Sequence, residues 1–390
     1  MMKTIYLDNN ATTAVAPEVL EEMLPYLRDH YGNPSSMYGM ARQTASKIQE
    51  ARARVAGLLG VSPEEVVFTS CGTESDSTAI WAAIRTTPQK RHLMTSRVEH
   101  SAIKNLYEYL ARNGYRVSFV PVDGKGRLDL DYLYDHLTED TAVVSLMWAN
   151  NETGVLFPVE EVSREVKNRG VVFHTDAVQA VGKIPMTIDP TGIDLLSLSG
   201  HKLHAPKGVG ALYVRKGTKY APFLIGGHQE GNRRGGTENV ASIVALGKAA
   251  ELAAGLLEEE NTRVKALRDR LESGILAAVP HAVVNGDTAH RLPNTTNISF
   301  EYIEGESILL MMDALGICAS SGSACTSGSL EPSHVLRAMG VPYTAAHGSV
   351  RFSLSAYNTA EEVDYVIEKL PPIIERLRAM SPFWKSVQAG

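Results

Sequence analysis

A lysine stands where an apolar segment gives way to a turn, and its position suggests a specific chemistry. Residues 194–214 read DLLSLSGHKLHAPKGVGALYV, with Lys202 shortly after Ser199 and His201. Lysines in such turns are commonly surface residues. A lysine in a partly apolar cleft near other cations, however, loses proton affinity and becomes a nucleophile toward aldehydes. Lys202 is therefore a candidate covalent catalyst.

Two further polar groups also follow apolar segments. In FTSCGTESDS, Gly72 and Thr73 stand at the expected start of a helix, whose unpaired N–H groups and positive dipole end favour a phosphate. In FHTDAVQA, Asp176 follows a strand of the buried type, and a buried carboxylate needs a partner such as a protonated ring nitrogen. Thr73 and Asp176 each also fit the simpler role of a helix N-cap.

Together these features fit one cofactor. Pyridoxal 5'-phosphate carries an anion, a pyridine nitrogen and an aldehyde, which would be matched by Gly72 and Thr73, by Asp176 and by Lys202. A nucleotide-binding enzyme is an alternative. Its motifs G-x-G-x-x-G after a strand and G-x-x-x-x-G-K-[ST] do not occur in the sequence, and GGHQEGNRRGG has the wrong spacing.

One cysteine lies in a segment of unusual composition. Residues 320–329, SSGSACTSGS, contain almost only Gly, Ser, Ala and Thr around Cys325, which predicts a flexible loop. A cysteine on such a tether can travel and can ionise, whereas a structural cysteine usually lies in an apolar run, as Cys318 does. A tolerated surface thiol is the simpler interpretation of Cys325. A metal or disulfide pair with Cys318 is disfavoured, because no other His or Cys lies nearby.

The elements that must position these residues follow a regular order. Up to about Ser242, short apolar runs alternate with helical patterns, as in RHLMTS followed by SAIKNLYEYLARNG. This order predicts an α/β fold with a mostly parallel, doubly wound sheet, in which ligands collect beyond the carboxyl ends of the strands. A long helix rich in Ala, Leu, Glu and Arg follows, and the remainder predicts a smaller α+β unit.

The composition limits the partners and the compartment. The 390 residues are 44% hydrophobic and 21% charged, with a net charge of -6 and no run of Lys and Arg, so we expect no nucleic-acid partner. The first residues lack the apolar core of a secretory signal. The best membrane candidate, SILLMMDALGICA, is short and contains Asp313. With three cysteines in the whole chain, we expect a cytoplasmic protein that does not bind a membrane.

Ten motifs along the chain resemble those of one enzyme family. They are YLDNNATT, GNPSS, CGTESDS, VEHSAI, NNETG, HTDAVQA, SGHKLHAPKG, RRGGTEN, SSGSACTSGSLEPSHVLRA and VRFSLS. In this order they are similar to the cysteine desulfurases of the NifS/IscS type, within the class-V aminotransferase family, over nearly the whole chain. MWANNETG and SGSLEPSHVLRAMG look most like the NifS group, which is linked to nitrogenase cluster assembly. Cys71 departs from the pattern, because a small hydroxyl residue is expected there.

The resemblance implies a fold and a division into domains. The fold would be that of the pyridoxal-phosphate-dependent transferases of fold type I, similar to aspartate aminotransferase. Residues 14–258 would form the large cofactor-binding domain. Residues 1–13 and 259–390 would form the small domain, which carries the mobile Cys325 loop at about 319–332.

The resemblance also implies a role for each matched residue. Lys202 would bind the cofactor covalently, Asp176 would pair with its pyridine nitrogen, and His100 would stack on its ring and assist proton transfer. Gln179 would contact the phenolic oxygen of the cofactor, and its phosphate would be held by Gly72, Thr73, Ser199 and His201. Thr237 would reach the phosphate of the neighbouring subunit of a homodimer. Asn151 would contact the ring oxygen and the substrate, and Arg351, helped by Asn33, would bind the substrate carboxylate.

The implied reaction is the removal of sulfur from L-cysteine. Lys202 would act as the base, and the Cys325 thiolate would attack the substrate sulfur, giving L-alanine and a persulfide on Cys325. An iron–sulfur scaffold protein would accept this sulfur for cluster assembly, with nitrogenase maturation as the expected use and no metal resident in the enzyme. A housekeeping desulfurase, a selenocysteine lyase, an aminotransferase and a non-catalytic sulfur carrier remain as alternatives.

Overall fold

The computed structural model describes residues 4–321 and 332–384. Its largest sheet has seven strands in the order β2-β8-β7-β6-β5-β3-β4. Strands β3 to β7 run parallel, as the sequence predicts, whereas β8 is antiparallel to both β2 and β7. The strands are β2 (Val66–Thr69), β3 (His92–Ser96), β4 (Arg116–Val120), β5 (Thr141–Ser145), β6 (Val172–Asp176), β7 (Leu195–Ser199) and β8 (Gly210–Val214).

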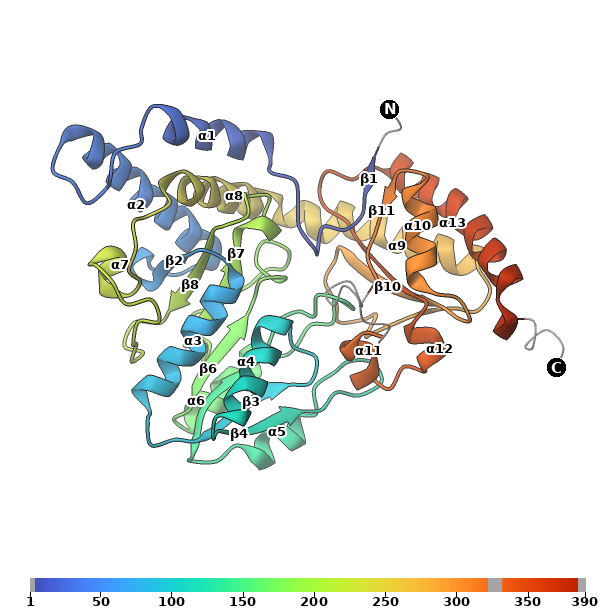
Figure 1. The fold of residues 1–390 in the computed structure, drawn as a ribbon, viewed down its shortest axis with the longest axis horizontal. Coiled ribbons are helices and arrows are strands. Elements are labelled where there is room, and N and C mark those ends of the chain that lie inside the picture. The colour runs from blue at the N-terminus through green and yellow to red at the C-terminus, as the bar shows by residue number, and fades with distance from the viewer. Residues whose placement is uncertain (1–3, 322–331, 385–390) are drawn as a thin grey trace.

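Helices pack around this sheet and form the larger part of the molecule, on the left in Figure 1. Strands such as β5 and β7 are buried along their whole length, as expected for strands covered on both faces. The helices of this part are α1 (Pro17–Arg28), α2 (Gly39–Leu59), α3 (Gly72–Thr86), α4 (Ser101–Arg112), α5 (Leu130–His136), α6 (Val159–Asn168) and α7 (Gln229–Asn232), with the short turns η1 (Pro63–Glu65) and η2 (Gly200–Lys202).

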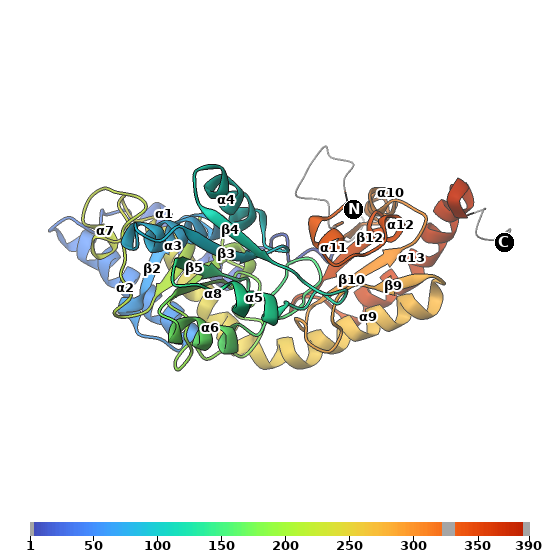
Figure 2. The same ribbon diagram turned by 90° about the horizontal axis from the view of Figure 1, so that it is seen from below.

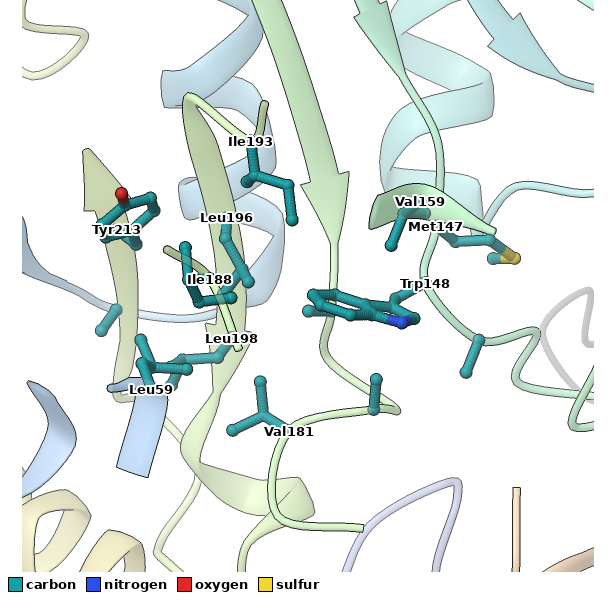
Figure 3. Packing of buried hydrophobic residues seen from close by; sticks show 14 of the residues in the cluster. Leu59, Met147, Trp148, Val159, Val181, Ile188, Ile193, Leu196, Leu198 and Tyr213 are labelled. Atoms are coloured by element: carbon teal, nitrogen blue, oxygen red, sulfur yellow. The ribbon is translucent and has the colours of Figure 1, made fainter. Parts of the chain in front are cut away.

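Apolar side chains fix the end of β7, from which the candidate catalytic lysine follows. Leu196 and Leu198 of β7 belong to the same buried cluster as Val181, Ile188 and Ile193 from the preceding connection (Figure 3). Fully burying one such side chain contributes about 1.5–3 kcal/mol to stability. This packing holds the strand in place, and the η2 turn begins directly after it.

A smaller unit lies beside the first (Figure 1, right). It contains an antiparallel sheet in the order β12-β10-β9 and a parallel pair of β1 and β11. The fold class predicted from the sequence is thereby confirmed. The elements are β1 (Ile5–Tyr6), β9 (Ala282–Val284), β10 (Thr295–Phe300), α10 (Gly305–Asp313), β11 (Ile317–Cys318), α11 (His334–Ala338), α12 (Tyr343–Ala346), β12 (Ser349–Ser353) and α13 (Ala360–Met380).

The apolar cores of the two units do not follow chain order everywhere. Ile5 and Leu7, near the start of the chain, pack in the core of the small unit. Val335 and Leu336 of α11, in contrast, pack with the core of the large unit. The domain boundaries at 13/14 and 258/259 stay a prediction.

A long helical stretch joins the two units (Figure 2). It consists of α8 (Val240–Glu259), the π-helical turn η3 (Glu260–Val264) and α9 (Lys265–Ala278). Helix α8 packs on α1 and α2 of the large unit, and α9 packs on α13 and β10 of the small unit.

This stretch, Val240–Ala278, is long and apolar enough to cross a membrane, unlike the shorter candidate at 307–319 that the sequence analysis singled out. Its most apolar window is 56% buried inside the protein. The core helix of a globular protein is apolar for the same reason, so we interpret the stretch as a core helix.

Candidate active site

A cavity of about 420 Å³ lies beyond the carboxyl ends of the parallel strands, where the sheet was expected to place a ligand. The small unit completes its wall through residues near β11 and β12. The predicted site residues that line the cavity are Gly72, Thr73, His100, Asn151, Asp176, Gln179, Ser199, His201, Lys202 and Arg351. The fold thus brings together residues that are up to 279 positions apart, from Gly72 to Arg351.

Two of the predicted residues do not line this cavity. Asn33 and Thr237 are exposed on the surface of the chain and do not line the cavity. Cys325 lies outside the described residues. Ser320 and Ser321, which precede it in the sequence, do line the cavity.

The start of α3 forms one end of the cavity and provides a place for a phosphate. Gly72 is the first residue of this helix, and a Cβ there would lie 3.0 Å from Val178 Cγ2 and 3.4 Å from Ser199 Cβ. The Ser199 hydroxyl is buried and has no hydrogen-bond partner within the described residues. An unpaired buried hydroxyl costs about 1–3 kcal/mol. A phosphate oxygen would remove this cost, so the residues present fit the phosphate of pyridoxal 5'-phosphate.

Asp176, the last residue of β6, lies in the middle of the cavity wall. Its Oδ1 accepts a hydrogen bond from the Val178 N–H at 2.9 Å. Burial raises the pKa of Asp176, while the nearby His100 and Lys202 act in the opposite direction. A protonated ring nitrogen beside this carboxyl would lower its pKa and be held by it, as the sequence predicts for the cofactor.

His100 caps the amino end of α4, since its Nδ1 accepts a hydrogen bond from the Ala102 N–H at 3.2 Å. Burial lowers the pKa of His100. A neutral ring that accepts through Nδ1 carries its proton on Nε2. His100 therefore offers the cavity an uncharged aromatic ring with a proton donor.

Lys202 ends the η2 turn, and its amine lies against the segment that follows β1. Its Nζ donates to the carbonyl oxygens of Asn10 at 2.5 Å and Ala11 at 2.6 Å. Burial, together with the charges of Lys183 and Arg351, lowers the pKa of Lys202 to about 7. A substantial fraction of the amine is therefore unprotonated at neutral pH, which is the state that attacks an aldehyde.

Arg351 of β12 faces the cavity from the small unit and is already paired. Its Nη2 donates to Asp8 Oδ1 at 2.6 Å and its Nη1 to the Asn151 carbonyl oxygen at 2.9 Å, while its buried Nε has no partner within the described residues. The sequence analysis did not assign Asp8. The two residues are 343 positions apart, so no local spacing indicates the pair.

The sequence analysis also missed a layer of buried groups behind the cavity. His174 Nε2 lies 3.6 Å from Asp76 Oδ1, and its Nδ1 shares a hydrogen bond with the Ser145 hydroxyl at 2.8 Å. Burial raises the pKa of Asp76 well above its usual range and lowers the pKa of His174 to about 3. Burial therefore disfavours the charged form of both groups.

Glu99, next to His100, is another buried carboxyl that the sequence analysis left unassigned. Both of its oxygens accept the Met147 N–H at 3.1 Å, and Oε1 accepts the Ser96 hydroxyl at 2.6 Å. Burial raises the pKa of Glu99 to about 8. Within residues 4–321 and 332–384, no group of three or more His, Cys, Asp or Glu side chains is arranged to hold a metal ion.

Comparisons with known proteins agree with this arrangement. The sequence profile of the family "Aminotransferase class-V" matches residues 5–366. The cysteine desulfurase NifS of Azotobacter vinelandii is 59% identical over 384 residues, which cover 98% of this chain and 96% of that protein.

Solved structures give the same result. A NifS-like protein is 41% identical with a TM-score of 0.90, over 96% of this chain and 100% of that one. SspA in complex with cysteine is 33% identical with a TM-score of 0.81, over 91% of this chain and 100% of that one. The chain belongs to the class-V aminotransferase family, and it is similar over nearly its whole length to the cysteine desulfurases within that family.

Proposed function

We propose that this protein is a cysteine desulfurase of the NifS type, which uses pyridoxal 5'-phosphate to convert L-cysteine to L-alanine and a persulfide on Cys325. Class-V aminotransferases depend on this cofactor, and the cavity fits it. One observation carries the proposal: in a chain 59% identical to NifS, Lys202 has its pKa lowered to about 7 in the same cavity as Asp176 and the unpaired Ser199 hydroxyl.

The chain holds the cofactor at each of its polar groups. When bound, the cofactor supplies an aldehyde that accepts an amine and a ring that withdraws electrons from the adjoining carbon. Lys202 would bind the aldehyde, and Asp176 would hold the ring nitrogen. Of the other residues that line the cavity, Gly72, Thr73, Ser199 and His201 would hold the phosphate, Gln179 and Asn151 the phenolic oxygen, and His100 the ring face.

Lys202 and Arg351 act on the substrate. The amine of cysteine would replace Lys202 at the aldehyde, and the freed, unprotonated amine of Lys202 would then remove the proton from the Cα of cysteine. The carbonyl oxygens of Asn10 and Ala11 set the position of this amine. Arg351 binds the substrate carboxylate. Because Asp8 already holds one side of the guanidinium, Asp8 fixes its orientation before the substrate arrives.

Cys325 takes the sulfur in the proposed reaction. Its thiolate attacks the substrate sulfur, so a sulfur–sulfur bond forms while the bond from Cβ to sulfur breaks. The electron pair of the broken bond would stay with the three-carbon fragment, which takes up one proton at Cβ and regains the Cα proton from Lys202 before it leaves as alanine. Ser321 lines the cavity, and Cys325 follows four positions later in the sequence, which supports this role.

A second copy of the chain is part of the proposal. Thr237 is exposed, and Ile225 in the same surface segment is 83% exposed, which leaves apolar surface for a partner. In a homodimer, Thr237 would reach the phosphate of the neighbouring site, and Asn33 would assist Arg351. We further propose that the enzyme is cytoplasmic and passes its sulfur to an iron–sulfur scaffold protein for nitrogenase maturation, with housekeeping cluster assembly as the second candidate.

The thiol role is tested by Cys325→Ala, with Cys318→Ala as the matched control. We expect Cys325→Ala to reduce alanine formation from L-cysteine on the order of 100-fold or more, while the visible absorbance of the bound cofactor stays intact. Cys318→Ala should retain activity. Normal turnover of cysteine by Cys325→Ala would contradict the proposal and favour another lyase or aminotransferase of the same fold.

The lysine role is tested separately with Lys202→Ala. This variant should lose both the visible absorbance of the bound cofactor and all turnover, because no other lysine among the described residues lines the cavity. Retained turnover would mean that a residue other than Lys202 binds the cofactor covalently. A purified wild-type protein that binds no pyridoxal 5'-phosphate when it is supplied would instead favour a non-catalytic sulfur carrier.

A further inference from the structure

A second lysine lies against the same residue that holds Lys202. Lys183 is only 6% exposed, and its Nζ donates to Gln179 Oε1 at 3.2 Å and to Asn10 Oδ1 at 3.4 Å. Lys202 Nζ donates to the main-chain oxygen of the same Asn10 at 2.5 Å. Two amines therefore share one asparagine, and lysine is rarely buried without a reason.

The charge of Lys183 is only weakly balanced. No carboxylate forms an ion pair with it within the described part of the chain, although Glu260 faces it. Burial lowers the pKa of Lys183 to about 8, with Glu260 acting in the opposite direction and Arg351 adding to the decrease. Lys183 is therefore mostly protonated at neutral pH. Its own carbonyl oxygen accepts a hydrogen bond from Asn261 Nδ2 at 2.9 Å, which fixes it to the π-turn of the long helix.

We propose that Lys183 is a positioning residue of the active site, which orients the amide of Gln179 and places a fixed positive charge beside Lys202. The inference rests on the proposed function for the roles of Gln179 and Lys202. It assigns a use to a buried charge that the reaction itself does not require.

The orientation of Gln179 follows from the chemistry of an ammonium group. A protonated amine only donates hydrogen bonds, so the side-chain oxygen of Gln179 has to face Lys183. The Nε2 group is then turned the other way, where it donates to the Asn10 carbonyl oxygen at 3.0 Å. Gln179 lines the cavity, so the second N–H of its amide becomes available to an oxygen of the cofactor.

The effect on Lys202 follows from repulsion between like charges. After burial, Lys183 makes the largest contribution to the lowered pKa of Lys202, ahead of Arg351. Arg351 is neutralised by its ion pair with Asp8. The other charged or titratable groups that face Lys202 are Asp8 and Asp176, which favour its protonated form, and the histidines His100 and His201, whose own pKa values are lowered by burial.

Three substitutions separate the two effects. Lys183→Met removes the charge and the hydrogen bonds, Lys183→Gln removes the charge but keeps an N–H donor, and Lys183→Arg keeps both. Lys167→Met is the matched control. Lys167 bonds to Asp194, which lies at the opposite end of β7 from Ser199.

The charge effect is measured in cofactor-free protein, without cysteine, so that it does not depend on turnover. Fluorodinitrobenzene reacts with an amine only in its unprotonated form, and mass spectrometry of the peptide that carries Lys202 gives the pH profile of modification at that residue. We expect Lys183→Met and Lys183→Gln to move the midpoint upward by on the order of one pH unit, so that labelling at about pH 6 falls about tenfold. Lys183→Arg and Lys167→Met should keep the wild-type profile.

The orientation effect is measured as the affinity for pyridoxal 5'-phosphate and the position of its visible absorbance band. Lys183→Met should weaken binding and shift the band, and Lys183→Gln should do so less. An unchanged Lys202 profile in both neutral variants overturns the charge effect, and an unchanged cofactor spectrum in Lys183→Met overturns the orientation effect. If circular dichroism shows that Lys183→Met does not fold, the labelling profile of Lys202 in Lys183→Gln tests the charge effect. The cofactor spectra of Lys183→Gln and Lys183→Arg, compared with each other, then test the orientation effect.

Discussion

Burial disfavours the ionised form of several carboxyl groups near the cavity. Burial raises the pKa of Glu99 to about 8 and that of Glu152 to about 7, and it raises the pKa of Asp76 well above its usual range. Glu152 also accepts a hydrogen bond from Ser333, which caps the start of α11. The walls of the site therefore carry less negative charge than the sequence suggests, and Asp176 is the carboxyl that a cofactor cation would meet.

Glu99 gives a prediction about stability and pH. Its pKa in the folded protein lies above that of an unfolded glutamate, about 4.3. Between these two values the folded state binds the extra proton, so the free energy of unfolding falls as the pH rises, by up to about 1.4 kcal/mol per pH unit for this group. We expect Glu99→Gln to remove this part of the slope.

The measurement compares urea unfolding of wild type and Glu99→Gln at about pH 5.5 and pH 7.5. The difference between the two proteins isolates Glu99 from the other titrating groups. Parallel slopes for the two proteins would show that Glu99 is ionised in the folded state, held by its hydrogen bonds from Met147 and Ser96.

The residues that the sequence revealed share one property. Asp176 ends the apolar strand β6, and Lys202 ends the short turn that directly follows the apolar strand β7, so their place at the edge of the sheet followed from local pattern alone. Lys183 and Asp8 have no such signal, because their importance depends on contacts with residues distant in the sequence, such as Arg351. Glu99 is next to His100, but the sequence does not distinguish it from an exposed polar residue, because its burial is visible only in the structure.

At the scale of elements, the close packing of α8 on α2 depends on a glycine, Gly247, at the point where the two helices meet. A Cβ on Gly247 of α8 would lie 2.5 Å from Ala51 Cα and 2.6 Å from Ala51 Cβ on α2. Alanine favours a helix by about 1 kcal/mol over glycine, but the overlap is with backbone and cannot be relieved by a rotamer change. We expect Gly247→Ala to lower the free energy of unfolding by about 1–3 kcal/mol.

Gly255 on the same helix is the control, because a Cβ there meets nothing within 4 Å. Gly255→Ala should therefore raise the free energy of unfolding by about 0.5–1 kcal/mol. Chemical denaturation of both variants checks the pair. A Gly247→Ala variant as stable as Gly255→Ala would mean that α2 and α8 separate without cost.

The order of the elements and the parallel direction of most strands were predictable, but the ends of the strands and the direction of β8 were not. The run TAVVSLMWA reads as one strand, yet β5 ends at Ser145. Beyond it the side chain of Asn150 accepts hydrogen bonds from the N–H groups of Glu152 and Thr153, which forms a turn. The antiparallel direction of β8 also escaped prediction, because apolar periodicity contains no information about strand direction.

At the scale of the whole molecule, the exposed Thr237 gives a test of the proposed homodimer. Lys202→Ala and Thr237→Val subunits should each form impaired homodimers. In a mixed dimer, the site of the Thr237→Val subunit keeps its own Lys202 and receives an intact Thr237 from its partner, so one complete site is restored.

Mixing the two variants under subunit-exchange conditions should therefore recover alanine formation and cofactor retention above the sum of the separate proteins. Mixing Lys202→Ala with wild type provides the reference for full exchange. Mass spectrometry shows whether the dimers are mixed. If mixed dimers recover no activity, Thr237 contributes to the site of its own chain or to neither site, and not to the site of the partner. The sequence pointed to this arrangement through family resemblance alone, since nothing in one chain shows what covers its surface.

The π-turn η3 lies in the helix that spans both units, and it touches Lys183 through Asn261 while Glu260 faces the lysine's charge. π-turns are places where a helix departs from regular geometry. If the small unit rotates against the large one as a substrate is enclosed, the distance between Glu260 and Lys183 has to change with it. Closure of the cavity would then change the proton affinity of Lys202. The pH profile of Lys202 reactivity would therefore differ with and without an unreactive cysteine analogue.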